Sequence, residues 1–410
     1  PLMSLYQLER DGDVQELIGL ARRSDNPELR ARAAELLGNF PDHDDREDVV
    51  NALVDVANTD DSAEVTAAAV DALDSLGGDG IERLIADVAG VDFEDGADWV
   101  KAKAYVRALD ADLPELRMAA ANGLGNLEQG DTVPNLVDCF DDPDPRVRAR
   151  AARACGQIAD PRSTDALEGL LTDGNATVRR EAAEALGNVG SRQALGALLP
   201  LYRDDNERVR RVAVGAFGNF GNERPVDYLV ESLTDDSAAV RRTAVYSLVE
   251  LLSNVPTEQS HEIRETVVER LSETDDRNVV LPLVEILEES RQASQQRNTA
   301  WLLGRVADEA ERDRVVEALV GALRADDQMT TQFAATSLAE LGGKTVERRL
   351  LALVDDESAG TDATAQAVFA LGKVGGEQSR ERIDKLLDQT EDEQVRKRAF
   401  SAISKLGGRR

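Results

Sequence analysis

The sequence predicts an all-α fold, an α-solenoid of about 11 stacked helical hairpins, and its main evidence is a regular spacing of glycines. Gly125, Gly156, Gly187 and Gly218 lie 31 residues apart, and each follows an alanine-rich segment such as residues 182–186. A fixed period of this size is typical of repeats that pack only on their neighbours. Aromatic residues make up only 4% of the chain, which favours helices packed closely through small side chains.

Residues 163–190 show one repeat as two amphipathic helices joined by a turn. Apolar residues recur at helical spacing from Ala166 to Leu171, and residues 172–175 are typical of a turn. A second helix carries an apolar stripe from Val178 to Val189. Gly190 is placed to end that helix, as glycine often does at a helix C-terminus.

The position of Gly187 recurs along the whole chain, which predicts about 22 helices including one extra. The aligned positions are Gly38, Asp74, Gly125, Gly156, Gly187, Gly218, Val249, Gly304, Ala339, Gly372 and Ser404. Two steps are long, 51 residues from Asp74 to Gly125 and 55 residues from Val249 to Gly304. The predicted organisation is a cloning remnant at 1–2, N-terminal repeats at 3–90, an insertion at 91–112, regular repeats at 113–253, an irregular extra helix at 254–277 and C-terminal repeats at 278–410.

An Asp followed six residues later by an Arg recurs in four consecutive repeats, and each Arg directly follows a Val. The pairs are Asp142 and Arg148, Asp173 and Arg179, Asp204 and Arg210, and Asp235 and Arg241. This pattern resembles HEAT repeats, in particular the short HEAT-like repeats first noted in phycobilin lyases. The resemblance covers nearly the whole chain, most clearly residues 112–252, and implies that these side chains form a ladder of bonds between adjacent repeats. It indicates the fold and says little about function.

The composition is strongly acidic, with 79 Asp and Glu against 48 Lys and Arg and a net charge of -31. Only seven of the 48 bases are Lys. A surface dense in carboxylates stays hydrated where salt screens charge, so this composition is typical of cytoplasmic proteins of salt-in halophiles. A merely acidic protein is the alternative. The charge argues against nucleic acid or an anionic membrane as the main partner.

No apolar run long enough to span a membrane and no signal peptide is evident in the sequence. We therefore expect a cytoplasmic protein, and a monomer. The segment Met3–Val14, taken with the composition, resembles the HEAT-repeat taxis proteins of haloarchaea. That family is implicated, with chemotaxis adaptors, in passing signals towards the archaellum motor. The resemblance implies a non-enzymatic scaffold or adaptor that binds other proteins, taxis adaptors among them. Two alternatives stay open: a bilin-lyase-like enzyme or its regulatory subunit, and a general assembly adaptor unrelated to motility.

Residue types that carry catalysis or hold cofactors are scarce. His43 and His261 are the two histidines, too few for a di-iron centre or the usual zinc ligand set. Neither Cys139 nor Cys155 lies in a CxxC motif, and no phosphate-binding loop motif occurs. The acidic segment 92–98 lacks the alternating oxygen ligands and closing Glu of a calcium loop. We predict no catalytic residue, no metal and no cofactor.

One stripe of each second helix, equivalent to positions 180, 184 and 188, is predicted to line a concave partner-binding surface. Across the repeats this stripe holds seven bases and three acids, although acids outnumber bases overall. It also holds large aromatics, which with Arg are enriched at interface hot spots. The predicted partner-binding residues are Arg153, Arg180, Arg211, Arg242, Tyr246, Arg297, Trp301, Arg305, Phe369 and Lys373, and the expected partner is acidic. The alternative is that these arginines pair with acids on adjacent helices.

The insertion at 91–112 provides a second candidate contact site, because insertions in repeat arrays often carry function. Its aromatic residues are Phe93, Trp99 and Tyr105. An exposed Trp99 would favour a contact site, whereas a buried Trp99 would indicate ordinary packing.

Overall fold

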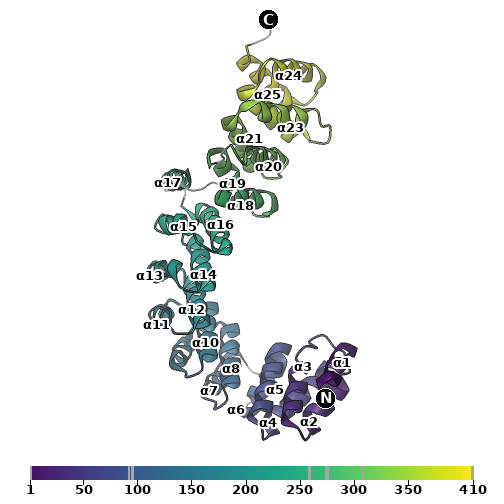
Figure 1. Ribbon diagram of the computed structural model, residues 1–410, viewed down its shortest axis with the longest axis vertical. Helices are drawn as coiled ribbons and strands as arrows, with labels where there is room; N and C mark the ends of the chain where they lie inside the picture. The colour runs from purple at the N-terminus through teal and green to yellow at the C-terminus, as the bar shows by residue number, and fades with distance from the viewer. Residues whose placement is uncertain are drawn as a thin grey trace. The chain divides into compact units, whose positions relative to one another are not determined.

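The computed structural model describes residues 2–90, 93, 97–256, 260–272, 277–306 and 309–407 (Figure 1). This part of the chain forms 25 α-helices and five short 3-10 helices, with no strand among its residues. The predicted all-α, α-solenoid class is confirmed. The chain divides into two compact units, Pro1–Leu198 and Leu199–Arg410, called unit 1 and unit 2.

Unit 1 contains the helices of the N-terminal half of the repeat array. They are α1 (Leu2–Asp11), α2 (Val14–Arg23), α3 (Pro27–Leu37), α4 (Arg46–Thr59), α5 (Ala63–Leu76), α6 (Gly78–Ala89), α7 (Asp98–Ala108), α8 (Pro114–Leu127), η1 (Gly130–Thr132), α9 (Val133–Asp138), η2 (Cys139–Asp141), α10 (Pro145–Ile158), η3 (Pro161–Ser163), α11 (Thr164–Leu170), α12 (Ala176–Val189) and α13 (Arg192–Leu198).

Unit 2 continues the alternation of first and second helices. Its helices are η4 (Leu199–Arg203), α14 (Glu207–Phe217), η5 (Gly218–Phe220), α15 (Val226–Ser232), α16 (Ala238–Asn254), α17 (Ser260–Ser272), α18 (Arg277–Glu289), α19 (Ala293–Val306), α20 (Arg312–Ala322), α21 (Gln328–Leu341), α22 (Gly343–Val354), α23 (Thr361–Val374), α24 (Glu377–Gln389) and α25 (Glu393–Lys405).

The second helices of the hairpins are those that carry, or end at, the eleven aligned positions. They are α3, α5, α8, α10, α12, α14, α16, α19, α21, α23 and α25. The expectation of about 22 helices with one extra is too low, because the described residues contain three helices beyond eleven hairpins. These are α1, one of the pair α6 and α7, and α17. Helix α17 lies within the segment 254–277, where the irregular extra helix was predicted.

Local sequence signals explain where the second helices begin and end. The side chain of Asn175 accepts hydrogen bonds from the backbone N–H groups of Thr177 and Val178, and so caps the start of α12. Asp144 caps α10 in the same way by accepting from the N–H of Arg146. Helix α12 ends at Gly190, whose φ of 67° lies in the left-handed region that glycine adopts without strain.

Close packing of second helices forms the core and depends on small residues at the contact. A Cβ added to Gly156 on α10 would lie 2.7 Å from the Cα of Ala185 on α12. The equivalent distance from Gly372 on α23 to the Cα of Ala402 on α25 is 2.8 Å. The helix backbones therefore touch at these glycines, which is the physical reason for the recurring glycine within each unit.

Candidate protein-binding site

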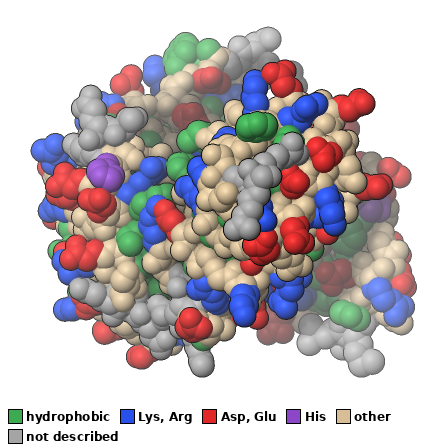
Figure 2. Space-filling view, turned by 90° about the horizontal axis from the view of Figure 1, so that it is seen from above, with side chains coloured by type: hydrophobic (Ala, Val, Ile, Leu, Met, Phe, Trp, Pro, Cys, Tyr) green, Lys and Arg blue, Asp and Glu red, His purple; other side chains and the backbone are tan. Residues whose placement is uncertain are grey.

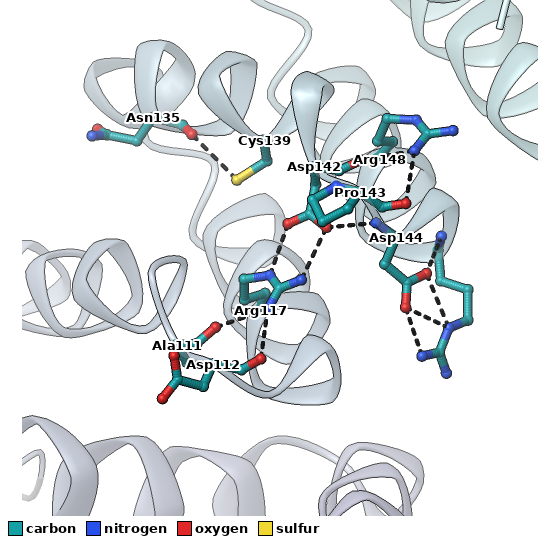
Figure 3. Close-up of polar contacts among 10 residues, drawn as sticks. Ala111, Asp112, Arg117, Asn135, Cys139, Asp142, Pro143, Asp144 and Arg148 are labelled. Atoms are coloured by element: carbon teal, nitrogen blue, oxygen red, sulfur yellow. Dashed lines mark hydrogen bonds and ion pairs between the residues drawn. The ribbon is translucent and has the colours of Figure 1, made fainter.

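Arg117 on α8 shows how one repeat is bonded to the next (Figure 3). Its Nε and Nη2 atoms donate to the two carboxylate oxygens of Asp142, at 2.7 and 2.9 Å. Its Nη1 atom donates to the backbone carbonyls of Ala111 and Asp112, at 2.8 and 2.9 Å. One guanidinium thus joins the turn before its own helix to the turn of the following repeat, in the bidentate geometry that makes such pairs strong.

The same arrangement recurs at the predicted ladder residues. Arg148 donates to both carboxylate oxygens of Asp173, at 2.8 and 3.1 Å, and to the carbonyl of Asp142 at 2.7 Å. Arg210 donates to both oxygens of Asp235, at 2.8 and 3.0 Å. We call this set, with Arg117 and Asp142, the arginine ladder. Each of its arginines lies 25 residues before its carboxylate partner.

The remaining predicted ladder residues bond to the turn before their own helix. Arg179 donates to the carbonyl of Asp173 at 2.9 Å, and Arg241 donates to the carbonyl of Asp235 at 2.6 Å. The carboxylate of Asp204 accepts from the N–H of Asn206 at 2.8 Å, and the Asp204 carbonyl accepts from Arg210 at 2.9 Å. These bonds hold the turn in the form that lets the next helix begin.

Two further arginines make equivalent contacts that sequence reasoning missed or assigned elsewhere. Arg30 on α3 donates to both carboxylate oxygens of Asp60, at 2.7 and 3.0 Å. Arg297 on α19, predicted to face a partner, donates instead to both oxygens of Asp327, at 2.7 and 2.6 Å. The carboxylate of Asp327 also caps α21, and these hydrogen bonds lower its pKa. Arg297 is thus engaged in contact between repeats.

Two predicted partner-binding residues of unit 1, Arg153 and Arg180, lie in one cleft of about 460 Å³. The cleft is formed by α5, α8, α10 and α12, at the place where the 31-residue step is interrupted. We call it the arginine cleft. Its lining residues are Asp71, Asp74, Ser75, Met118, Arg146, Ala149, Arg150, Arg153, Thr177, Arg180 and Glu181.

Two of the four arginines in the arginine cleft are held by neighbouring carboxylates. Arg146 pairs with Asp144 at 2.7 Å and with buried Glu115 at 2.9 Å. Arg180 donates to Glu181 through Nη2, while its Nε is buried and has no hydrogen-bond partner among the described residues. These two guanidiniums are therefore positioned mainly by the protein itself.

Arg150 and Arg153 differ, because neither forms an ion pair with any residue that the structure describes. Arg153 is exposed and Arg150 is half-buried. Asp74 lies in the same cleft and accepts a hydrogen bond from Asn122 at 2.9 Å. Burial raises the pKa of Asp74, an effect that the positive charges of Arg150 and Arg153 oppose. The two guanidiniums thus interact with Asp74 through their charge, without an ion pair among the described residues.

The predicted residues of unit 2 fall into paired and unpaired groups. Arg242 pairs with Glu285 at 2.7 Å and lies 5.8 Å from the ring centre of Tyr246. Arg305 pairs with Glu340 at 2.8 Å and lies 4.4 Å from the ring centre of Trp301. Pairing with acids on adjacent helices, the alternative interpretation of the stripe, thus describes both arginines.

The unpaired group comprises Arg211, Phe369 and Lys373, and its two cations have no carboxylate partner among the described residues. Arg211 is exposed and forms no ion pair within the described part of the chain. Lys373 lies 4.8 Å from the ring centre of half-buried Phe369. Uncompensated positive charge therefore persists on the stripe at separate places, one near α14 and one on α23.

The aromatic residues of the second candidate contact site differ in their exposure to solvent. Trp99 at the start of α7 is 57% exposed, and Lys103 lies 4.7 Å from its ring centre. Tyr105 is only 3% exposed, because its ring packs where a Cβ on Gly123 would otherwise lie, so its assignment as a contact residue is wrong. Burial raises the pKa of Tyr105. Phe93 lies 6.2 Å from the Tyr105 ring, and most of the acidic segment 92–98 lies outside the described residues.

Acrylamide quenching should distinguish the two tryptophans of the chain. Trp99 is exposed, whereas Trp301 is half-buried between Arg264 and Arg305. We expect the Trp301→Phe variant, which emits from Trp99, to be quenched several-fold more strongly than the Trp99→Phe variant. Equal quenching constants would mean that Trp99 is covered, and α7 would then offer no contact site.

The described residues offer neither a metal site nor a membrane-spanning helix. Among them, no group of His, Cys, Asp and Glu is arranged to hold a metal ion. None of the helices found there combines the length and apolar character needed to cross a bilayer. Cys139 and Cys155 are buried free thiols, and burial raises the pKa of Cys139 to about 11.

Comparison with known proteins identifies the family to which the chain belongs. HEAT repeats match residues 14–104, 102–177 and 168–249. A HEAT repeat-containing taxis protein of Halobacterium salinarum is 52% identical over 411 residues, which cover 99% of both chains. The solved structure of an engineered protein is 21% identical to this chain, with a TM-score of 0.46, and the match covers 96% of this chain and 98% of that one. The Halobacterium source of the relative agrees with the halophile interpretation of the composition. The chain belongs to the HEAT-repeat family and, within it, to the HEAT repeat-containing taxis proteins.

Proposed function

We propose that this protein is a non-enzymatic, cytoplasmic scaffold of taxis signalling that binds carboxylate-rich protein partners through the arginine cleft. The name of its relative supports the taxis role. HEAT arrays use their extended surfaces to bind proteins, which supports the scaffold role. The link towards the archaellum motor is part of the same proposal.

The observation that carries the proposal is the pair Arg150 and Arg153. Both line a cleft of about 460 Å³ without an ion pair among the described residues, in a chain with 79 acids. A guanidinium that lacks an internal partner gains bidentate hydrogen bonds when a carboxylate arrives.

The test is affinity purification from a haloarchaeal host at multimolar KCl, with the recovered proteins identified by mass spectrometry. We expect the unmodified chain to recover chemotaxis adaptors and the Arg150→Glu/Arg153→Glu variant to lose most of them. The matched control is Arg192→Glu/Arg208→Glu, which changes the net charge equally at two exposed residues outside the cleft. No adaptors with the unmodified chain would contradict the taxis role. Equal losses in both variants would contradict the arginine cleft.

A further inference from the structure

The last helix, α25, exposes a face that is buried in every comparable helix of unit 2. Four residues before the aligned position stand Val245, Ala300, Ala335 and Val368, and all four are buried. The equivalent residue of α25 is Phe400, which is 68% exposed. Phe400 is therefore a large apolar side chain left exposed at a position that is packed in the other second helices.

In the preceding repeats of unit 2, this face of a second helix packs against the next second helix. The aligned glycine of α23, Gly372, lies against Ala402 of α25, and that of α19, Gly304, lies against Ser337 of α21. The aligned position therefore faces the next second helix. In α25 this position is Ser404, exposed and one helical turn from Phe400. Phe400 and Ser404 thus mark the site where one more helix would pack.

Arg396 shows that the arginine ladder is also open at this end. It lies eight residues before the aligned position, as Arg210 does in its own repeat. Arg210 is bonded in bidentate fashion to Asp235 of the following repeat. Arg396 is exposed, and its guanidinium has no hydrogen bond or ion pair with any residue in the described ranges. A carboxylate of a partner protein would give Arg396 the bidentate contact that Asp235 gives Arg210.

The sequence from Val395 onwards is basic, although the chain as a whole is acidic. Residues 395–410 contain six Lys and Arg and no acid, within a chain of net charge -31. Lys373, Arg398 and Lys405 lie 4.8, 5.0 and 5.8 Å from the ring centre of Phe369. Across the described residues none of the three cations has a carboxylate partner. Figure 2 looks onto the end where Figure 1 places the C-terminus, and shows basic, acidic and hydrophobic side chains interspersed on that face.

A second copy of the chain fits this surface poorly. In a head-to-tail arrangement α25 would need the outer face of the first hairpin, but α1 packs against α2 and α3 there. Leu5 of α1 is buried, and Asn39 donates to Glu9 of α1 at 2.8 Å. A tail-to-tail arrangement would bring together two Arg396 guanidiniums that have no carboxylate partner among the described residues, which is unfavourable. Charge therefore selects a different, acidic occupant.

We infer that α25 docks an acidic amphipathic helix of a partner protein, which packs where the next second helix of the array would lie. An Asp at the start of that helix pairs with Arg396, and its small apolar side chains cover Phe400. Arg398 and Lys405 lie on the other side of α25, over the ring of Phe369, and take no part in this contact. This surface belongs to unit 2, so it does not rest on the arginine cleft of unit 1.

The probe is a short stapled helical peptide with Asp at its N-cap, Ala and Leu on one face and Glu on the other. Its amide analogue carries Asn and Gln at the acidic positions. Fluorescence anisotropy with the full chain in multimolar KCl reports close contacts, because salt screens long-range attraction. We expect the acidic peptide to bind, the amide analogue to bind about ten-fold more weakly, and Arg396→Gln or Phe400→Ser each to weaken binding about ten-fold.

Two matched control variants each remove one exposed cation or one exposed apolar side chain elsewhere in unit 2. Lys385→Gln removes one exposed cation from α24, and Met329→Ser removes one exposed apolar side chain from α21. Both should leave binding within about two-fold, as should the cleft variant Arg150→Glu/Arg153→Glu. The inference fails if the controls weaken binding as much as the α25 variants do. It also fails if Phe400→Ser abolishes self-association of the chain, or if DNA or anionic vesicles bind α25 in preference to the peptide.

Discussion

Replacing Gly156 by Ala should lower the free energy of unfolding by about 1–3 kcal/mol, because α10 and α12 touch at this residue. The new Cβ would lie 2.7 Å from the Cα and 2.8 Å from the Cβ of Ala185. Neither atom can rotate away, so one helix must move. Repeat arrays are stabilised by contacts between neighbours, so this movement weakens the coupling of the repeats on either side.

The control for this variant is Gly169→Ala on α11. Gly169 is exposed, and no heavy atom lies within 4 Å of the added Cβ. The substitution should stabilise the chain by up to about 1 kcal/mol, since alanine favours helix more than glycine. Denaturant midpoints by circular dichroism, with hydrogen exchange of α10 and α12, measure both effects. Stabilisation by Gly156→Ala as well would show that the helices are not in contact.

Breaking one rung of the arginine ladder should cost a similar or larger amount. In the Arg148→Leu variant the mostly buried carboxylate of Asp173 loses its guanidinium, and the Asp142 carbonyl loses a donor. We expect a loss of about 2–4 kcal/mol in the free energy of unfolding. The exposed pair of Arg32 and Glu35 on α3 provides the control. Arg32→Leu should change stability by less than about 0.5 kcal/mol.

The acid limb of the stability curve gives an independent check on the same rung. Burial alone would raise the pKa of Asp173, but hydrogen bonds from Arg148 and from the N–H of Asn175 outweigh it and lower the pKa. The stabilisation is therefore present above the unfolded pKa near 4 and is lost as pH falls through the lower folded pKa. Arg148→Leu should flatten the stability curve in this acidic window and leave its shape near neutrality unchanged. An unchanged acid limb would exclude the rung as its cause.

The repeat period could predict the helices because one short-range rule governs every contact. A glycine at a fixed position lets two backbones touch, and the 31-residue spacing records that contact directly. Capping residues such as Asn175 and the end at Gly190 follow from local chemistry. All of this information lies within one repeat, so a single sequence is enough to recognise it.

The arginine cleft was only partly predictable, because its walls come from repeats separated by an interruption. Arg153 and Arg180 followed from the stripe, but Arg150 lies outside it. Its place beside Asp71 and Asp74 depends on α5 meeting α8 across two intervening helices. No local pattern encodes that contact.

Arg297 shows a second limit of prediction from sequence, in which a residue is assigned to the wrong role. Arg297 falls on the predicted stripe, and Gln296 stands eight residues before Gly304, as Arg148 and Arg210 stand before Gly156 and Gly218. Gln296 does donate to the carbonyl of Ser290 at 2.9 Å, as ladder arginines donate to theirs. However, its amide lacks the charge and fork to hold a carboxylate, and the neighbouring Arg297 pairs with Asp327 instead. The sequence signal for this pair was Asp327, the acidic residue at the N-cap of α21.

The spacing of the arginine ladder has an evolutionary consequence. Arg117, Arg148 and Arg210 each find an Asp 25 residues ahead, within a period of 31. Deleting or duplicating one whole period leaves every surviving arginine with an Asp at the same separation. Such an event needs no compensating substitution, since the new neighbours are bonded as the old ones were. Unequal recombination could therefore lengthen or shorten this protein one repeat at a time without passing through a misfolded ancestor.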